Sequence, residues 1–272
     1  MIFLLLIVGF IAGVVGSLVG LGGGIIIVPS LLFLGSISTT FHSITPQLAV
    51  GTSLVVIFFT GLSSTISYLK YKTVDYKSGL LLFLGSGPGT VIGAWVNNYL
   101  QADSFLFYYG LFILFISFIL FWKDKMKRPA TLKEKSWKRS YEDQNGSMHH
   151  YSFSPVVGLL ISFFVGFTSG LFGVGGGALM VPAMIMLFMF PPHVAVATSM
   201  FIITLSSIMG SFTHISLGNV HWLFAALLIP GAWIGAKIGA WLNQRLTSKM
   251  VIVGLRIMLL IVGVRLLIEG LF

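Results

Sequence analysis

The sequence has no cysteine and few charged residues, and these two absences exclude several classes of protein. Without cysteine the chain cannot form disulfides, thiolate metal sites or cysteine nucleophiles. Charged residues make up 8% of the 272 residues, whereas a soluble domain usually has about 25%. A surface with so little charge cannot face mostly water. An ordinary soluble enzyme and a disordered protein are therefore both excluded.

What the chain has instead is a series of long apolar runs, and a membrane-spanning helix needs roughly 20 such residues. The runs lie at 1–20, 24–36, 47–69, 79–97, 104–122, 153–172, 175–190, 194–216, 222–242 and 250–268. They predict an all-α integral membrane protein. The second and seventh runs are short, and tilted spans, half-membrane segments and second halves of broken helices all fit them. No basic side chain precedes the first run, so we expect a membrane segment there rather than a signal peptide.

One hydrophilic segment, residues 123–152, divides the chain into a first half (1–122) and a second half (153–272). It contains 12 of the 23 charged residues, so the net charge of +9 does not indicate a nucleic-acid surface. Because basic residues prefer the cytoplasmic side of a membrane, we expect a charged cytoplasmic tether. A docking site or a lipid-headgroup contact is the alternative function for this segment.

The two halves are an internal duplication. Residues 13–29 and 166–182 are identical at 8 of 17 positions, and residues 85–97 and 231–243 at 7 of 13. Between these blocks, AVGTS at 49–53 corresponds to AVATS at 195–199. Three blocks in the same order predict two equivalent membrane repeats joined by the tether.

Loop charges indicate that the repeats are inverted. The loop 70–78 carries three lysines and its counterpart 216–224 has no Lys or Arg, whereas 244–250 is basic and its counterpart 98–104 is not. The basic loop has thus moved to the other end of the equivalent helix. Because basic loops prefer the cytoplasmic side, the two repeats are predicted to insert into the membrane in opposite orientations. Inversion needs an odd number of crossings in each half. We therefore expect 24–36 and 175–190 to cross the membrane, giving five crossings per half and both termini outside. A parallel four-plus-four arrangement is the alternative.

Each repeat contains a glycine-rich motif, GLGGG at 20–24 and GVGGG at 173–177. Consecutive glycines destabilise a helix interior by roughly 1 kcal/mol each, so we predict a break at both places. The helix that restarts after a break presents free N–H groups and a positive dipole end, which favour an anion. Close helix packing is the alternative interpretation. The predicted site residues of the motifs are Gly20, Gly22, Gly23, Gly24 and Pro29, with Gly173, Gly175, Gly176, Gly177 and Pro182.

Hydroxyl and cationic side chains complete the predicted anion site. Thr52, Ser53, Thr198 and Ser199 recur near the start of the helix after each motif. Their hydroxyls fit hydrogen bonds to a bound anion, or capping within the helix. Lys237, Arg256 and Arg265 fall inside apolar runs, and no Asp or Glu does. Lys237 and Arg256 are candidate substrate-binding residues, with snorkelling towards headgroups as the alternative, and we assign Arg265 to snorkelling.

Two other features have a structural interpretation. Glycines spaced by four at 85, 89 and 93, and again at 231, 235 and 239, predict closely packed helices. His214 is the histidine well inside a predicted span, where a proton relay and a satisfied core histidine are the two alternatives.

These motifs together make the chain similar to the TauE/SafE family of sulfite exporters and related permeases. The similarity depends on GxGGGxxxVP in each half, on the TS pairs and on the two glycine-spaced helices, and covers nearly the whole chain except the tether. It implies transport of a small sulfur-containing anion, such as sulfite or an organosulfonate, across the prokaryotic cytoplasmic membrane. It implies no cofactor and no nucleic acid, and it leaves a coupling proton or ion open.

Three functions can be compared on the sequence alone. The paired breaks and the basic-only membrane charge favour a secondary transporter, and an anion channel on the same scaffold is the alternative. An intramembrane enzyme lacks support, because HExxH, GxSxG and intramembrane carboxylates are all missing. No Walker A sequence occurs, which argues against an ATPase on this chain.

The inverted arrangement makes a topology prediction. Single cysteines placed at Lys72 and Lys249 should both react with an impermeant thiol reagent from the cytoplasmic side only, because both loops are basic. The cysteine-free chain provides the unlabelled background. Labelling of the two positions from opposite sides would exclude the inversion.

Overall fold

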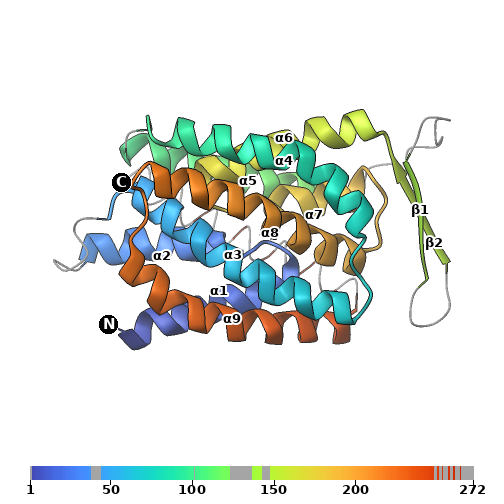
Figure 1. The fold of residues 1–272 in the computed structure, drawn as a ribbon, viewed down its shortest axis with the longest axis horizontal. Helices are drawn as coiled ribbons and strands as arrows, with labels where there is room; N and C mark the ends of the chain where they lie inside the picture. The colour runs from blue at the N-terminus through green and yellow to red at the C-terminus, as the bar shows by residue number, and fades with distance from the viewer. Residues whose placement is uncertain are drawn as a thin grey trace.

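The computed structural model describes residues 2–37, 44–100, 102–122, 137–142 and 148–247, with single positions at 250, 253, 257, 260 and 264. Helices make up most of it (Figure 1). In the first half they are α1 (Ile2–Val19), α2 (Gly24–Ile37), α3 (Pro46–Lys70), α4 (Tyr76–Asn97) and α5 (Ala102–Trp122). In the second half they are α6 (Pro155–Phe172), α7 (Gly177–Met186), α8 (Pro192–Ser216) and α9 (Trp222–Arg245). Two strands, β1 (Trp137–Glu142) and β2 (Met148–Phe153), lie between them.

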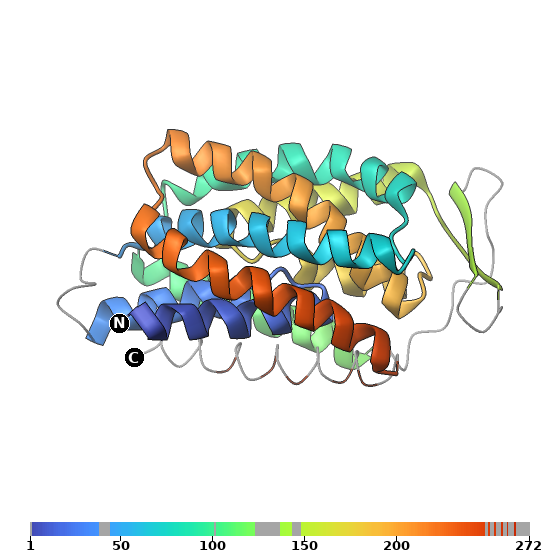
Figure 2. The ribbon, with the colours of Figure 1, turned by 60° about the horizontal axis from the view of Figure 1, so that its bottom comes forward.

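The helices lie roughly along one common axis, as a membrane bundle requires (Figure 2). Among the described residues, 6 helices are long and apolar enough to cross a membrane: α1, α3, α4, α6, α8 and α9. The helical membrane architecture is therefore confirmed. In the part of the chain that the structure describes, the departure from an all-α fold is the β-hairpin, which lies beyond one end of the bundle. We call this end the hairpin end.

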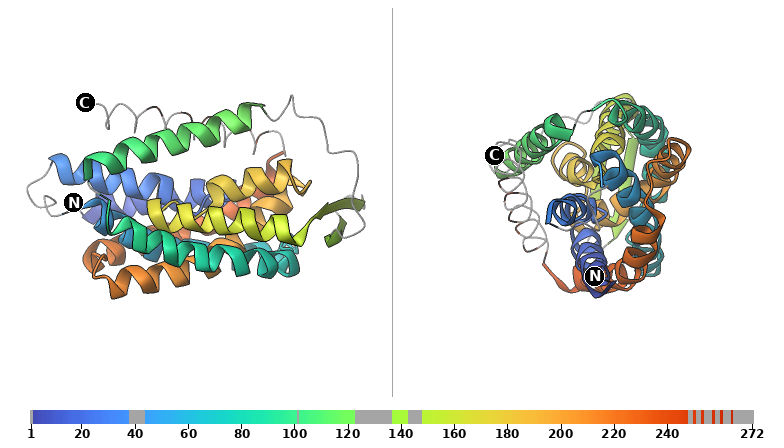
Figure 3. Two further views of the ribbon diagram at one scale, coloured as in Figure 1. Left: turned by 90° about the horizontal axis from the view of Figure 1, so that it is seen from above. Right: turned by 90° about the vertical axis from the view of Figure 1, so that its left-hand side faces the viewer.

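The two short helices do not cross the membrane. With 14 residues in α2 and 10 in α7, they extend about 21 and 15 Å, less than the roughly 30 Å of a bilayer core. The start of α1 and the end of α2 lie at the same end of the bundle in Figures 1 and 2 and in the left view of Figure 3. Each pair, α1–α2 and α6–α7, is thus a helical hairpin that returns after its glycine motif. The expected crossings at 24–36 and 175–190, and hence five crossings per half, are wrong.

Each glycine-spaced helix packs on a helix of the opposite half. α9 lies against α1, and α4 against α6. A Cβ at Gly89 would collide with the carbonyl of Phe163, and one at Gly235 with the carbonyl of Phe10. Only glycine permits this backbone approach. The close-packing interpretation of these glycines is confirmed.

Helices α3 and α8 form the centre of the bundle and are the most buried of the candidate spans. They meet at Thr65 and Thr204, whose hydroxyl oxygens are 3.1 Å apart. Gly61 lies against Thr204 and keeps the two helices close. The two Thr-Ser pairs, at 52–53 and 198–199, therefore lie on the two most buried of the candidate spans.

Part of the tether is folded rather than a plain connector. β1 and β2 pair antiparallel from Trp137↔Phe153 to Glu142↔Met148. Tyr151 packs on Phe190 with ring centroids 4.1 Å apart, and Phe153 stacks on Phe188 at 4.7 Å. The hairpin is thus attached to the segment between α7 and α8, a contact that the charge pattern of 123–152 does not indicate.

The glycine contacts make a stability prediction. Gly89→Ala and Gly235→Ala should each destabilise the protein by about 1–3 kcal/mol, because the new methyl group pushes two backbones apart. The melting temperature of detergent-purified protein measures this. Gly87→Ala is the matched control on α4, since its Cβ meets the movable ring of Phe83 rather than backbone. Equal melting temperatures for Gly87→Ala and Gly89→Ala would contradict the packing argument.

Candidate functional site

The two glycine motifs form breaks that meet in the interior. α1 ends at Val19 before α2 begins at Gly24, and α6 ends at Phe172 before α7 begins at Gly177. The φ angles are 81, 83 and 93° at Gly20, Gly22 and Gly23, and 68, 83 and 71° at Gly173, Gly175 and Gly176. Residues other than glycine rarely adopt these positive φ angles. We call residues 20–24 the first break and 173–177 the second break.

The breaks contact each other across the boundary between the halves. The carbonyl of Gly20 lies where a Cβ of Gly177 would be, and the carbonyl of Gly173 lies where a Cβ of Gly24 would be. The predicted breaks are therefore confirmed, and the structure brings them together.

Ser53 and Ser199 lie at the breaks and connect the two halves. The Ser53 hydroxyl donates to the carbonyl of Gly173 at 2.9 Å, and the Ser199 hydroxyl donates to the carbonyl of Gly20 at 2.7 Å. Both serines are fully buried. Carbonyls released by a broken helix need such partners where no water reaches them. Each serine thus pairs a carbonyl in the break of the other half.

The hydroxyls of Thr52 and Thr198 do not bond to the breaks, as those of the serines do, but to the starts of helices in the opposite half. The Thr52 hydroxyl accepts from the N–H of His221 at 2.9 Å, and the Thr198 hydroxyl accepts from the N–H of Asp75 at 3.0 Å. His221 and Asp75 are the N-cap residues of α9 and α4. The threonines therefore position the helix starts, again across the two halves.

The amides of each break come before the first helical hydrogen bonds. In α2 these run from Ile26 and Ile27 to the carbonyl of Gly23, and in α7 from Leu179 and Met180 to the carbonyl of Gly176. The amides at the start of α2 and α7 thus form the positive ends of two short helices. Earlier in the breaks, the amides of Gly22 and Gly173 already donate to the carbonyls of Gly16 and Ser169. Pro29 and Pro182 lie within α2 and α7, as the sequence suggests.

A small cavity adjoins the second break. Its volume is about 10 Å³, and its walls include Gly175, Gly176 and the side chains of Ser86, Ser169 and Ser206. The hydroxyl oxygens of Ser86 and Ser206 are 2.7 Å apart. Such a space holds about one water molecule. The structure is therefore closed at the second break, where serine and glycine residues line the remaining space.

Of the two predicted cations, the structure describes Lys237, which is not at the breaks. Lys237 is an exposed residue of α9 and lines a pocket to which neither break contributes. Arg256 lies outside the described residues. His214 is fully buried in α8, with its Nε2 atom 3.2 Å from the carbonyl of Gly170.

Asp75 is a buried carboxylate that sequence reasoning missed. Arg139 of β1 donates to both of its oxygens, at 2.9 and 3.2 Å, and the hydroxyls of Tyr151 and Ser78 donate at 2.9 and 2.6 Å. Burial acts to raise the pKa of Asp75, but the hydrogen bonds from Arg139, Ser78 and Tyr151 outweigh it and hold the pKa below its usual value. Asp75 therefore fastens the hairpin to the start of α4.

The similarity to known proteins extends over nearly the whole chain. The family model of the sulfite exporter TauE/SafE matches residues 5–266. The probable membrane transporter protein YunE of Bacillus subtilis is 54% identical over 269 residues, covering 99% of this chain and 98% of that protein. A probable membrane transporter of Methanocaldococcus jannaschii is 29% identical over 266 residues, covering 94% and 90%. No solved structure matches.

The Asp75 contact makes a pH prediction. A carboxylate whose pKa is lowered by folding stabilises the protein above its unfolded pKa, near 4, and this stabilisation is lost as the pH falls through the folded pKa. Asp75→Asn should therefore lower the melting temperature at pH 7, by the equivalent of about 1–2 kcal/mol, and the difference should shrink below about pH 4.

Arg139→Gln should have the same effect in the same direction, and Lys138→Gln, the exposed neighbour on β1, should have none. A melting difference for Asp75→Asn that stays constant from pH 7 to pH 3 would contradict the role given to the carboxylate.

Proposed function

This chain belongs to the sulfite exporter TauE/SafE family, and we propose that it carries small sulfur-containing anions, such as sulfite or an organosulfonate, by alternating access. The family model extends over nearly the whole chain, and the relatives are membrane transporters. The chain is thus a multi-pass membrane transporter and not an enzyme. The substrate class and the mechanism rest on the arguments below.

The observation that carries the proposal is the meeting of the two breaks. The residues that start α2 and α7, Gly24 and Gly177, come from opposite halves, and each lies against the other break in the interior. Two positive helix ends beside buried hydroxyls favour an anion over a cation. The membrane runs also lack carboxylates, which a cation carrier would normally contain. The substrate would therefore lie between the breaks, near the bundle centre.

The same contacts suggest how access is closed and opened. With a cavity of about 10 Å³ at the second break, a sulfur oxyanion has no room. The bonds from Ser53 to Gly173 and from Ser199 to Gly20 join the halves at this depth. We infer that one of these two serine–carbonyl hydrogen bonds breaks when the substrate enters, while the other stays formed. The released serine hydroxyl then donates to the anion instead of the carbonyl.

The helix directions support inverted repeats. α3 ends just before Asp75, which binds Arg139 of the hairpin. α8 begins just after Phe190, which packs on Tyr151 of the same hairpin. The two equivalent helices therefore run in opposite directions, as Figure 1 also shows. In the first half, where α1 and α2 form a hairpin, the remaining long helices α3, α4 and α5 give the odd number of crossings that inversion needs.

An anion channel on the same scaffold is the second candidate, and flux measurements separate it from a carrier. The experiment is uptake of labelled sulfite, sulfoacetate and sulfate into proteoliposomes, with and without a proton gradient. A carrier gives saturable uptake that can be driven above the external concentration. Flux that only equilibrates and does not saturate would support the channel, and no flux of any of the three anions would contradict the substrate class.

The glycine amides make a sharper prediction. Gly176→Ala should abolish most of the thermal stabilisation that sulfite gives to the purified protein, because the methyl group occupies the space beside the amides. Gly23→Ala should do the same, but its Cβ would also lie 2.7 Å from the carbonyl of Ala12, so it carries a larger folding cost. Gly176 has only side-chain and more distant contacts and is the cleaner position.

Gly235→Ala serves as the control: it should lower the intrinsic melting temperature and keep the full ligand-induced shift. If Gly176→Ala also keeps the full shift, the anion site is elsewhere, and Lys237 and Arg256 become the leading positions.

A further inference from the structure

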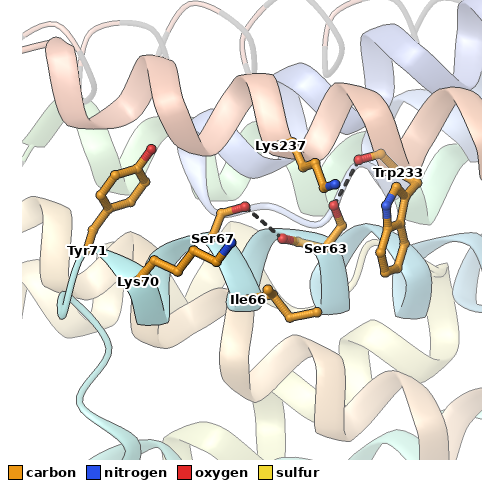
Figure 4. Close-up of a pocket in the computed structure, with 7 residues that line it drawn as sticks. All are labelled: Ser63, Ile66, Ser67, Lys70, Tyr71, Trp233 and Lys237. Atoms are coloured by element: carbon orange, nitrogen blue, oxygen red, sulfur yellow. Dashed lines mark hydrogen bonds between the residues drawn. The ribbon is translucent and has the colours of Figure 1, made fainter.

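A second polar site lies between α3 and α9, apart from the breaks. It is a pocket of about 350 Å³, shown in Figure 4. Its polar walls come from Ser63, Ser67, Lys70 and Tyr71 of the α3 side and from Trp233 and Lys237 of α9. Figure 4 shows Lys237 projecting from α9 towards Ser63, and Lys70 extending along α3 towards Ser67.

The two lysines are the uncompensated groups of this pocket. The Ser63 hydroxyl donates to the carbonyl of Trp233 at 2.8 Å, and the Ser67 hydroxyl donates to the carbonyl of Ser63 at 2.9 Å. Both hydroxyl hydrogens are therefore already used. Within the described part of the chain, neither lysine has a carboxylate at ion-pair distance. The pocket is thus a concave surface with two positive charges and donors free for an anion.

The pocket opens near the hairpin end. Lys70 is the last residue of α3, and Asp75 shortly after it binds the hairpin. Lys237 lies two helical turns before Arg245, the last residue of α9, so it sits about 12 Å from that helix end. An ammonium group at this depth needs an anionic partner or a path to the headgroups. By the positive-inside rule this basic end faces the cytoplasm.

The equivalent groove between α8 and α4 shows that the fold does not require these cations. At the positions equivalent to Ser63, Ser67, Lys70, Trp233 and Lys237 the chain has Met209, Thr213, Ser216, Gly87 and Val91. In the inverted arrangement proposed above, that groove would open on the other face of the membrane. The groove with the two lysines would thus face the cytoplasmic leaflet, which holds the anionic lipids, and the groove without them would face the other leaflet.

We propose that this pocket binds the phosphate headgroup of an anionic phospholipid of the cytoplasmic leaflet. The lysines pair with the phosphate. The acyl chains lie along the exposed apolar side chains that flank the pocket, Ile66 and Leu69 on α3 and Ile234 and Ile238 on α9, which are 42, 49, 55 and 37% exposed. A free oxyanion shares the headgroup's chemistry, but it would leave this adjoining apolar surface unused.

The test uses the full chain in nanodiscs of phosphatidylcholine with increasing phosphatidylglycerol, and measures the melting temperature. In the wild-type protein phosphatidylglycerol should stabilise more than phosphatidylcholine. In Lys70→Gln/Lys237→Gln the apparent affinity for phosphatidylglycerol should fall about fivefold for each lysine removed. Lys72→Gln/Lys77→Gln, two exposed lysines of the same loop outside the pocket, should keep the wild-type affinity.

Three results would overturn the proposal. One is an unchanged preference for phosphatidylglycerol in Lys70→Gln/Lys237→Gln. Another is that inorganic phosphate, in nanodiscs of pure phosphatidylcholine, stabilises the wild-type protein as much as phosphatidylglycerol does, which assigns the pocket to a free oxyanion. The third is loss of sulfite-induced stabilisation in the same variant, which places Lys237 on the substrate path. Lys70→Arg/Lys237→Arg keeps both charges and should keep the lipid preference, so it separates a lost headgroup contact from a general folding defect.

Discussion

The structure depends on one constraint: a backbone carbonyl released inside an apolar bundle must find a donor. Each glycine break releases such carbonyls where lipid and packed side chains exclude water. Ser53 and Ser199 supply the donors, and each reaches into the break of the other half. The chain thus keeps two interrupted helices in its interior without leaving these groups unpaired. The price of that arrangement is that neither break is complete without the opposite half.

The same interdependence extends to the outer helices. α1 of the first half packs on α9 of the second, and α4 of the first packs on α6 of the second. In both pairs glycines bring the backbones into contact. Thr52 and Thr198 also bond across the halves, since Thr52 holds the start of α9 and Thr198 holds the start of α4. The duplicated sequence therefore folds as one interlocked body, in which a movement of one half changes the surroundings of the other.

Local sequence signals were sufficient for some of these features and not for others. Consecutive glycines predicted the breaks, and glycines spaced by four predicted the packed helices, because both depend on backbone freedom and side-chain size near one position. The return of α2 and α7 was missed, since an apolar run of that length does not encode its direction. The partners of Ser53 and Ser199 lie 120 and 179 residues away. Asp75 gave no periodic or motif signal, and its binding to Arg139 arises only when the tether folds back.

The hairpin contact makes the two ends of the molecule unequal. Asp75 and His221 occupy equivalent N-cap positions, but among the described residues a guanidinium holds only Asp75. Separating the helices at the hairpin end therefore breaks an ion pair that has no counterpart at the opposite end within the described part of the chain. In the proposed alternating cycle, the resting population is biased towards the state that opens away from the hairpin. Because the Arg139 side chain is 28% exposed, dissolved salt screens the pair, and ionic strength on the tether side becomes a control on which face stays open.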